Sequence, residues 1–255
     1  MKIQYSVSLW NFSHYAPYPT LERIVQRVRE EGFGIELWQW SPNEADLYDE
    51  TGRKRLAGLL EGMAVSLHSG CLGGRFGLDY HRKQIDAAVC FGAKTIIMHD
   101  SDLTKDNGEF DVDMVNRAIQ YAASKGVTLC LENGYAFDSL AKGLDAFPEL
   151  SFCLDVGHVY MAKSTMKIHL DAYKHRLAHM HLQDIRLPSE DAMPLAPSDH
   201  YTPGSGGIPH EDWQLLGSTL REIDFNGIAT IEVLPRNPLQ LAKDAVSFWE
   251  PFTKD

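Results

Sequence analysis

Eight short apolar runs rich in β-forming residues recur along this chain, and their spacing constrains the fold more than any other feature of the sequence. The runs cover residues 3–10, 34–40, 64–70, 95–100, 128–134, 151–157, 177–184 and 228–234. The first seven begin about 23–33 residues apart, which is the length of one strand followed by one helix. The runs are apolar almost throughout, as expected for parallel strands that are buried on both faces.

The segments between most of these runs have the periodicity of amphipathic helices. In the segment that starts at Leu21, four apolar side chains fall on one face, and Gly32 provides a good C-terminal cap. Residues 81–93 and 112–126 follow the same pattern. Eight such units without a linker predict the α/β class and one (β/α)8 barrel, with residues 1–255 forming a single domain.

Two further segments bear on this architecture. An open doubly wound sheet, the rival fold, would need a glycine-rich phosphate-binding turn after an early strand, and residues 8–17 (SLWNFSHYAP) contain no glycine. Residues 185–213, after the seventh run, are rich in Pro, Gly and Ser. We expect a long loop there, and long loops inside compact domains are usually functional.

Composition narrows the classes of function. The chain is 44% hydrophobic, which is enough for a sizeable core. Its formal net charge of −11 argues against nucleic acid as a partner, although a local basic groove can exist on an acidic protein. The four cysteines have no C-x-x-C spacing, so we expect reduced thiols in the core. No window reaches the ~20 apolar residues of a membrane span, and the start lacks the features of a signal peptide. These observations predict a soluble, cytoplasmic protein with no membrane partner, and they leave a homo-oligomer open.

Acidic and imidazole side chains stand at the carboxyl ends of most of the runs. In a barrel these ends meet on one face, where active sites are built. Imidazole and carboxylate are ligands of divalent cations such as Zn²⁺, Mn²⁺ and Co²⁺, and neighbouring carboxylates repel one another unless a cation lies between them. The residues concerned are His68, His99, Glu132, Asp155, His158, His179, His181 and Glu232. Together they predict a metal site at the mouth of the barrel.

Each residue has a plainer interpretation when it is taken alone. A single His is more often a hydrogen-bonded structural residue, Asp155 could cap a helix, and Glu132 could lie in a solvated turn. His179 and His181 share one face of a strand; we expect His181, nearer the mouth, to be the ligand and His179 to pack in the layer below. Glu36 is expected to face the lumen as well, with no role assigned. Six consecutive runs with metal-capable groups favour the metal site over these separate explanations.

The motifs SLHSG, IIMHD, LCLENG, FCLDVGHVYMA, HMHLQD, HYTPGSGGI and IEVLP resemble those of the xylose isomerase-like TIM barrels, in order, over the third to eighth runs. That superfamily includes sugar isomerases, 3-epimerases, myo-inositol catabolism enzymes and endonuclease IV. Resemblance to the epimerase branch implies one divalent ion (Mn²⁺, Zn²⁺, Co²⁺ or Mg²⁺) held by Glu132, Asp155, His181 and Glu232. It also implies that Glu132 and Glu232 transfer a substrate proton through a metal-stabilised enediolate. His158 would then bind a substrate oxygen.

The endonuclease IV branch gives an alternative with up to three Zn²⁺ ions. Its additional histidines match His68, His99, His158 and His200. Its Asp two residues before the last of these falls on Ser198 here, with Asp199 next to it, and its HLND motif reads HLQD with Gln183. These departures weaken the match to the third ion. An Arg found in many family members is matched only approximately by Arg186, at a different spacing.

Residues near the expected mouth favour a sugar over DNA. Residues 41–50 (SPNEADLYDE) carry four acids and no Lys or Arg, whereas a DNA enzyme must neutralise phosphates. Aromatic residues gather at the first two runs, and sugars stack on such rings. The expected substrate-binding residues are Trp10, His14, Trp38, His68, His99, Arg186 and His200. The sequence therefore predicts an enzyme, a metal-dependent sugar or sugar-phosphate isomerase or epimerase. The alternatives are a zinc phosphodiesterase acting on abasic DNA, a polyol or cyclic-acid dehydratase or lyase, and a non-catalytic barrel.

Overall fold

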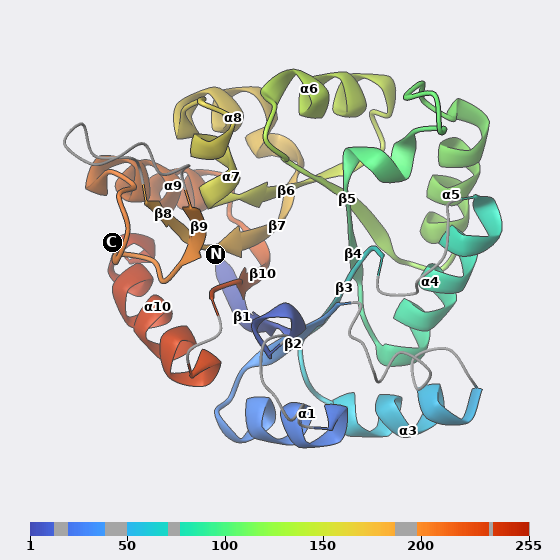
Figure 1. The fold of residues 1–255 in the computed structure, drawn as a ribbon, viewed down its shortest axis with the longest axis horizontal. Helices are drawn as coiled ribbons and strands as arrows, with labels where there is room; N and C mark the ends of the chain where they lie inside the picture. The colour runs from blue at the N-terminus through green and yellow to red at the C-terminus, as the bar shows by residue number, and fades with distance from the viewer. Residues whose placement is uncertain (13–19, 39–49, 71–76, 187–197, 235–236, 255) are drawn as a thin grey trace.

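Eight parallel strands close into a barrel in the order β1-β10-β7-β6-β5-β4-β3-β2 (Figure 1). The structure is a computed structural model that describes residues 1–12, 20–38, 50–70, 77–186, 198–234 and 237–254. The barrel strands are β1 (Lys2–Ser8), β2 (Gly34–Leu37), β3 (Val65–His68), β4 (Thr95–Met98), β5 (Thr128–Glu132), β6 (Ser151–Asp155), β7 (Leu177–Leu182) and β10 (Asn226–Ile231). Each of the eight apolar runs overlaps one of these strands, so the predicted (β/α)8 TIM barrel is confirmed.

Helices surround the barrel on its outside (Figure 1). The α-helices are α1 (Leu21–Glu30), α3 (Glu50–Leu60), α4 (Leu78–Phe91), α5 (Val112–Ser124), α6 (Phe137–Ala146), α7 (Val156–Met161), α8 (Met166–Tyr173), α9 (His210–Glu222) and α10 (Pro238–Thr253). Three short 3₁₀ helices are η1 (Leu9–Phe12), η2 (Asp100–Leu103) and η3 (Lys174–Arg176).

The first helix shows how local sequence sets the boundaries of an element. The Thr20 side chain accepts a hydrogen bond from the backbone N–H of Arg23 and caps the start of α1. The four apolar residues of its predicted inner face are all buried. The helix stops as expected at Gly32, whose φ of 79° suits glycine far better than other residues.

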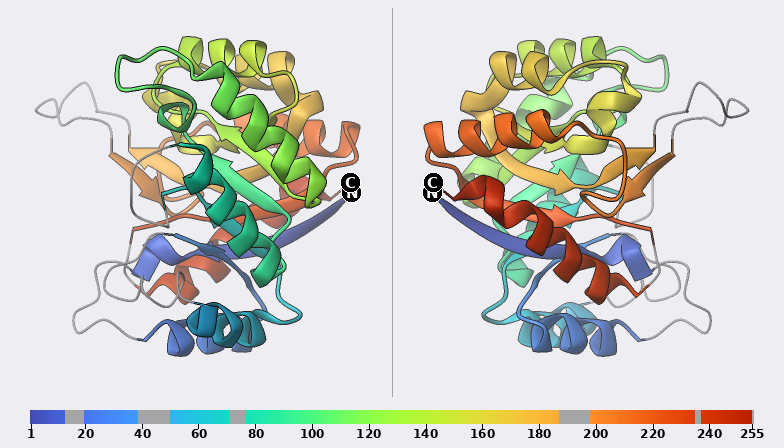
Figure 2. Two further views of the ribbon diagram at one scale, coloured as in Figure 1. Left: turned by 90° about the vertical axis from the view of Figure 1, so that its right-hand side faces the viewer. Right: turned by 90° about the vertical axis from the view of Figure 1, so that its left-hand side faces the viewer.

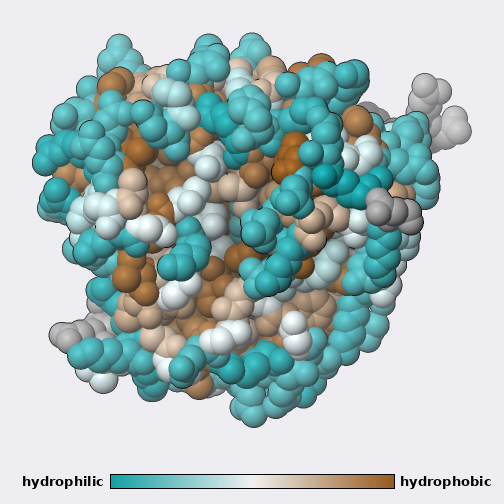
Figure 3. Space-filling view, turned by 180° about the vertical axis from the view of Figure 1, so that it is seen from behind, coloured by the Kyte–Doolittle hydropathy of each residue, from teal (hydrophilic) through white to brown (hydrophobic). Residues whose placement is uncertain are grey.

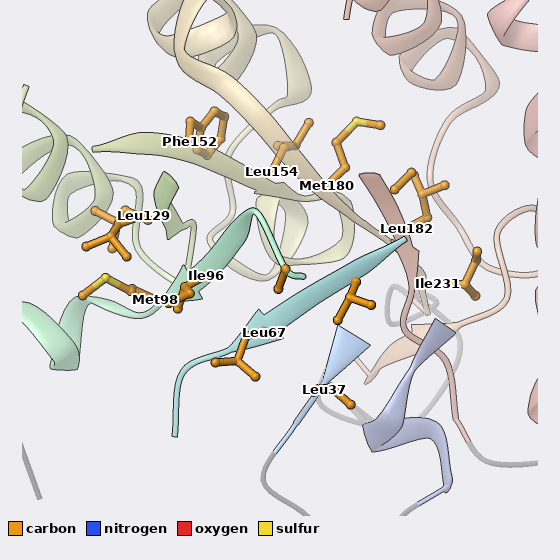
Figure 4. Close-up of a cluster of buried hydrophobic side chains, with 14 of the residues drawn as sticks. Leu37, Leu67, Ile96, Met98, Leu129, Phe152, Leu154, Met180, Leu182 and Ile231 are labelled. Atoms are coloured by element: carbon orange, nitrogen blue, oxygen red, sulfur yellow. The ribbon is translucent and has the colours of Figure 1, made fainter. Parts of the chain in front are cut away.

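Side chains alternate along the strands between an apolar outer layer and a polar lumen. Figure 4 shows the outer layer, where side chains such as Leu67, Phe152 and Ile231 point away from the barrel axis toward the helices. On the lumen side, Ile97, Cys130 and Cys153 form a small apolar cluster. The remaining lumen positions include Ser6, Glu36, Ser66, His179, His181 and Thr230, all completely buried. The usual barrel interior of branched aliphatic residues is therefore replaced here by hydrogen-bonding and ionisable groups.

The two ends of the barrel differ in character. Figure 2 shows both termini at one end of the barrel axis, and η1 with the short strands β8 and β9 at the other. Figure 3 looks at the end that carries the termini, where hydrophilic residues gather around the rim and hydrophobic residues toward the centre. The carboxyl ends of the barrel strands, and with them the predicted site, lie at the opposite end.

Two expectations from the sequence need correction. Residues 185–213 are not simply a loop, because β8 (Asp184–Arg186) and β9 (Ser198–Tyr201) pair as an antiparallel ribbon, although residues 187–197 lie outside the described residues. Cys90 is exposed on α4 and not in the core, whereas Cys130 and Cys153 are buried free thiols and Cys71 lies outside the described residues. Among the described helices, none is both long and apolar enough to cross a membrane.

Candidate metal centre and active site

Four side chains from four different strands converge at the mouth of the barrel. Glu132, Asp155, His181 and Glu232 each offer a ligand atom, and these atoms all lie within 4.8 Å of one another. All four residues are buried. The Nδ1 atom of His181 faces the three acids, at 3.1 Å from Glu132 Oε1, 3.4 Å from Glu232 Oε2 and 3.7 Å from Asp155 Oδ2.

Asp155 serves both as a helix cap and as a member of this cluster. Its Oδ1 atom accepts a hydrogen bond from the backbone N–H of His158 at 2.8 Å and so caps α7. The side-chain amide of Gln183 donates to both carboxylate oxygens, at 2.9 and 2.7 Å. Asn133 clamps the backbone of Asp155 through hydrogen bonds of 2.7 and 2.8 Å. The capping interpretation is therefore correct, and the cap leaves Oδ2 directed at the site.

Gln183 also connects this centre to the ribbon. Its Oε1 atom accepts a hydrogen bond from the backbone N–H of His200 on β9. Gly157 leaves the space for this bridge, because a Cβ atom at that position would lie 2.6 Å from Gln183 Oε1. Gln183, which stands where the endonuclease IV motif has Asn, therefore links Asp155 to the ribbon of β8 and β9.

Glu132 is the most heavily contacted acid of the centre, and it is not a solvated turn residue. Its side chain is surrounded by imidazole nitrogens of His68, His99, His158 and His181, at 3.1 to 3.3 Å. The Nδ1 atom of His158 also lies 3.0 Å from the carbonyl oxygen of Asn133. A carbonyl only accepts hydrogen bonds, so Nδ1 of His158 carries the hydrogen and Nε2 stays available toward the cavity.

The surroundings of the two glutamates keep them ionised. Burial raises the pKa of Glu132, but the charge of His181 and hydrogen bonds from His158 and His181 outweigh it and hold the pKa well below its ordinary value. In Glu232, burial also raises the pKa, and the charge of His181 together with a hydrogen bond from His200 lowers it overall. Ionised carboxylates are competent both to bind a cation and to accept a proton.

Two residues of this centre, Glu132 and Glu232, line a cavity of about 570 Å³. Its lining includes Trp10, Trp38, His68, His99, Glu132, Tyr135, His158, His200 and Glu232. The Trp38 ring is tilted against the His68 ring with centroids 3.7 Å apart, and the Trp10 ring is tilted against that of His200 at 4.3 Å. Trp10 and Trp38, two of the predicted substrate-binding residues, therefore line the same pocket as Glu132 and Glu232.

Two of the predicted substrate-binding residues are not placed in this pocket. His14 lies outside the described residues. Arg186 lines a neighbouring cavity that shares His200 with the first, and its guanidinium lies over the Tyr201 ring, 4.4 Å from the centroid. His179 lies below the rim as expected, completely buried and 3.0 Å from Glu36 through its Nε2 atom.

Sequence reasoning missed Tyr135 and Ser8. The Tyr135 ring meets the His158 ring edge-on with centroids 4.8 Å apart, and its hydroxyl donates to Asp199 at 3.0 Å. Ser8 donates to Glu232 at 3.2 Å. Tyr135 follows a strand end in the same way as Trp10 and Trp38, so the rule that selected those rings would have found it.

The four central residues fit a divalent metal ion. Three carboxylates and one imidazole form a set of hard and borderline donors, which suits cations of the Mn²⁺, Zn²⁺ and Co²⁺ type. Glu132 Oε2 is buried and accepts no hydrogen bond from the described residues, although two imidazole nitrogens lie 3.1 and 3.3 Å away. A cation between these acids would relieve the repulsion that three buried carboxylates otherwise exert on one another.

A second group of potential ligands lies at the edge of the same pocket. His158, Asp199 and His200 each present a ligand atom, and these atoms also lie within 4.8 Å of one another. Asp199 thus provides a carboxylate beside the position where Ser198 departs from the endonuclease pattern. Burial lowers the pKa of His200, but hydrogen bonds with Asp199 and Glu232 raise it to about 10.

The closed parallel barrel and the buried acids and imidazoles at its mouth define a (β/α)8 barrel with a candidate site for a divalent metal. The chain belongs to the xylose isomerase-like TIM barrel family, whose sequence pattern matches residues 11–252. No curated protein matches the sequence.

Several solved structures share the fold over nearly the full length of the chain. D-psicose 3-epimerase in the presence of D-fructose is 15% identical with a TM-score of 0.68, and the match covers 98% of this chain and 99% of that one. The IOLI protein with a binding zinc atom is 15% identical with a TM-score of 0.69, covering 98% and 96%. The probable 3-DHS dehydratase AsbF from Bacillus anthracis is 17% identical with a TM-score of 0.66, covering 96% and 97%.

Proposed function

We propose that this protein is a metal-dependent sugar or sugar-phosphate isomerase or epimerase, with residues 1–255 acting as one domain. The observation that carries the proposal is the convergence of Glu132, Asp155, His181 and Glu232 beside a pocket that Glu132 and Glu232 line together with aromatic rings. The similarity of the fold to sugar epimerases supports it.

Glu132, Asp155, His181 and Glu232 would hold one divalent ion, Mn²⁺, Zn²⁺, Co²⁺ or Mg²⁺. When bound, this ion would polarise the carbonyl and the adjacent hydroxyl of a sugar and make the neighbouring C–H more acidic. The acids supply the negative charge, and His181 supplies an imidazole nitrogen through Nδ1. Their burial limits competition from water for the ion.

Glu132 and Glu232 are proposed to exchange the substrate proton. Their strands, β5 and β10, are separated in the barrel by β6 and β7, so the two carboxylates approach a bound sugar from different directions. Both have a lowered pKa and are ionised at neutral pH, so either can accept a proton from carbon. In an epimerase one removes the proton and the other returns it on the opposite face.

The walls of the pocket are proposed to orient the sugar. Trp10, Trp38 and Tyr135 offer ring surfaces to the apolar C–H face of the substrate, and His158 offers Nε2 to a hydroxyl. His68, His99 and His200 line the same space and complete the hydrogen-bonding set. Arg186 would reach only a substrate that extends past His200 into the neighbouring cavity, and the role of His14 stays a prediction from sequence.

A proton-exchange assay tests the two-base scheme. Metal-loaded protein is incubated in deuterated water with a panel of ketoses and ketose phosphates, and incorporation at the carbon next to the carbonyl is measured. Glu132→Gln and Glu232→Gln should each lower the exchange rate by about 10²–10⁴-fold. Glu61→Gln, at an exposed glutamate outside the pocket, is the matched control and should exchange at the parent rate. Full exchange in either active-site variant would reject the scheme.

The group formed by His158, Asp199 and His200 favours a second candidate, a zinc phosphodiesterase of the endonuclease IV type. This candidate requires up to three Zn²⁺ ions per chain and nicking of an abasic duplex. We instead expect elemental analysis to find about one divalent ion per chain, and we expect the protein not to nick an abasic duplex. Three zinc ions with nicking abolished by His68→Ala would replace the sugar proposal. A dehydratase would begin with the same proton abstraction as the proposed isomerase. It would be distinguished by a product that contains one water molecule less than the substrate.

A further inference from the structure

Glu36 is a completely buried acid that the proposed reaction does not use. It lies on β2 in the middle of the lumen, below the mouth of the barrel. A buried carboxylate is strongly disfavoured unless other groups compensate its charge, so its partners indicate its role. These partners connect it directly to the candidate metal centre.

One oxygen of Glu36 is fixed by neighbours on three other strands. Its Oε2 atom accepts hydrogen bonds from the hydroxyls of Ser66 at 2.9 Å and Thr230 at 3.2 Å, and His179 Nε2 lies 3.0 Å away. The Thr230 hydroxyl, which donates to Glu36, has two other close neighbours, the Ser6 hydroxyl at 2.7 Å and His179 Nε2 at 2.9 Å. This arrangement holds the plane of the carboxylate in place.

The second oxygen of Glu36 faces His181. Its Oε1 atom lies 3.1 Å from His181 Nε2, and both residues are completely buried. Neither atom has a hydrogen-bond partner elsewhere among the described residues, so each is the nearest polar group that the other faces. The two nitrogens of the His181 ring therefore face different surroundings: Nε2 faces Glu36, and Nδ1 faces Glu132, Asp155 and Glu232.

A neutral imidazole offers a lone pair at only one nitrogen, and its other nitrogen carries the hydrogen. An acid beside one nitrogen holds the hydrogen there, fixes the ring orientation and makes the opposite nitrogen a better ligand. We propose that Glu36 is a positioning residue that keeps the hydrogen of His181 on Nε2 and directs the Nδ1 lone pair at the divalent ion. This inference rests on the metal site of the proposed function.

Two measurements on the wild-type protein and its variants test the assignment. Calorimetric titration of the metal-free chain with Zn²⁺ gives the affinity, and Glu36→Gln should weaken it by about 10- to 100-fold. Gln keeps the volume of Glu and an acceptor oxygen but lacks the charge. Glu61→Gln makes the same change at an exposed glutamate outside the pocket and is the matched control, so its Zn²⁺ affinity should differ from wild type by less than about threefold.

Nitrogen NMR of the His-labelled wild-type chain loaded with isotopically labelled cadmium gives a readout that does not depend on any variant. We expect metal coupling to Nδ1 of His181 and a bound hydrogen on Nε2. Coupling to Nε2, or a Glu36→Gln variant that folds and binds Zn²⁺ within twofold of wild type, overturns the role of Glu36 alone. If the wild-type chain binds no divalent ion, the proposed metal site is wrong and this inference is wrong with it.

Discussion

His200 has a backbone conformation that few residues other than glycine adopt, with a φ of 63°. Several contacts hold it there. Its backbone N–H donates to Gln183, its ring lies on Trp10, and its Nδ1 atom is 3.0 Å from Asp199 Oδ1. Conformations of this kind persist where the surroundings fix them and are concentrated at functional sites. The strain directs the imidazole toward Glu232, 3.7 Å away.

The ion pair of His200 makes stability depend on pH. Its folded pKa of about 10 exceeds the unfolded value of ~6.5, so the folded state binds the extra proton between these values. The stabilisation is fully present below ~6.5 and is lost as the pH rises through about 10. The hydrogen bond from His200 lowers the pKa of Asp199 to about 2. The stabilisation that ionised Asp199 contributes is therefore lost only in strong acid.

We therefore expect the unfolding temperature of the chelator-treated chain to fall between pH ~6.5 and about 10. His200→Gln should reduce this slope, and the remaining slope should come from His158, whose pKa is raised to about 9, and from His99 and His181, whose pKa values are also raised. His175→Gln, at an exposed histidine on η3, should leave the slope unchanged. Identical slopes in wild type and His200→Gln would contradict the assignment.

The carboxylate of Asp184, on β8, holds the turn that follows the ribbon of β8 and β9. Its Oδ1 atom accepts from the backbone N–H groups of Ile185 and Ile208, and its Oδ2 atom from those of Gly204 and Gly206. The next residue back, Gln183, holds His200. Two adjacent side chains thus fix both the ribbon and the turn that follows it.

Removing the carboxylate of Asp184 should destabilise the ribbon of β8 and β9 and the turn that follows it. Asp184→Ala leaves four N–H groups without their acceptor and is expected to lower the free energy of unfolding by about 3 kcal/mol, with Asp184→Asn intermediate. Denaturant unfolding followed by circular dichroism measures the loss. Asp171→Asn, at an exposed aspartate on α8 paired with Lys167, should change it by less than about 0.5 kcal/mol. Wild-type stability in Asp184→Ala would show that the turn does not depend on this carboxylate.

The elements that could be predicted from the sequence are those whose apolar residues form a continuous run or recur with the period of a helix. Apolar runs located the eight barrel strands, and the acids and histidines at their ends were recognisable because parallel strands place these ends together. The ribbon was not predicted because β8 (DIR) and β9 (SDHY) are mostly polar and form no apolar run of the kind that located the barrel strands. The contact between Glu36 and His181 joins strands that are not neighbours in the barrel, so it depends on geometry across the lumen that no local pattern encodes.

Apolar packing and buried charge lie in different parts of the barrel. Its apolar packing lies between strands and helices, while the lumen holds Glu36, Glu132, Asp155 and Glu232 in one buried space. Such a group of acids destabilises the folded chain unless imidazoles or a cation compensate it. A divalent ion that binds only the folded state should therefore stabilise the whole molecule.

We predict that Zn²⁺ or Mn²⁺ at 100 times its dissociation constant stabilises the chain by about 2.7 kcal/mol, or on the order of 5 °C in unfolding temperature. Asp155→Asn should lose most of this shift. The metal-free variant should unfold near the wild-type temperature, because Asn also caps helices well and one negative charge leaves the cluster. Asp171→Asn should keep the full shift. Scanning calorimetry with and without chelator measures all three proteins, and an equal ion-induced shift in Asp155→Asn and wild type would place the ion away from Asp155.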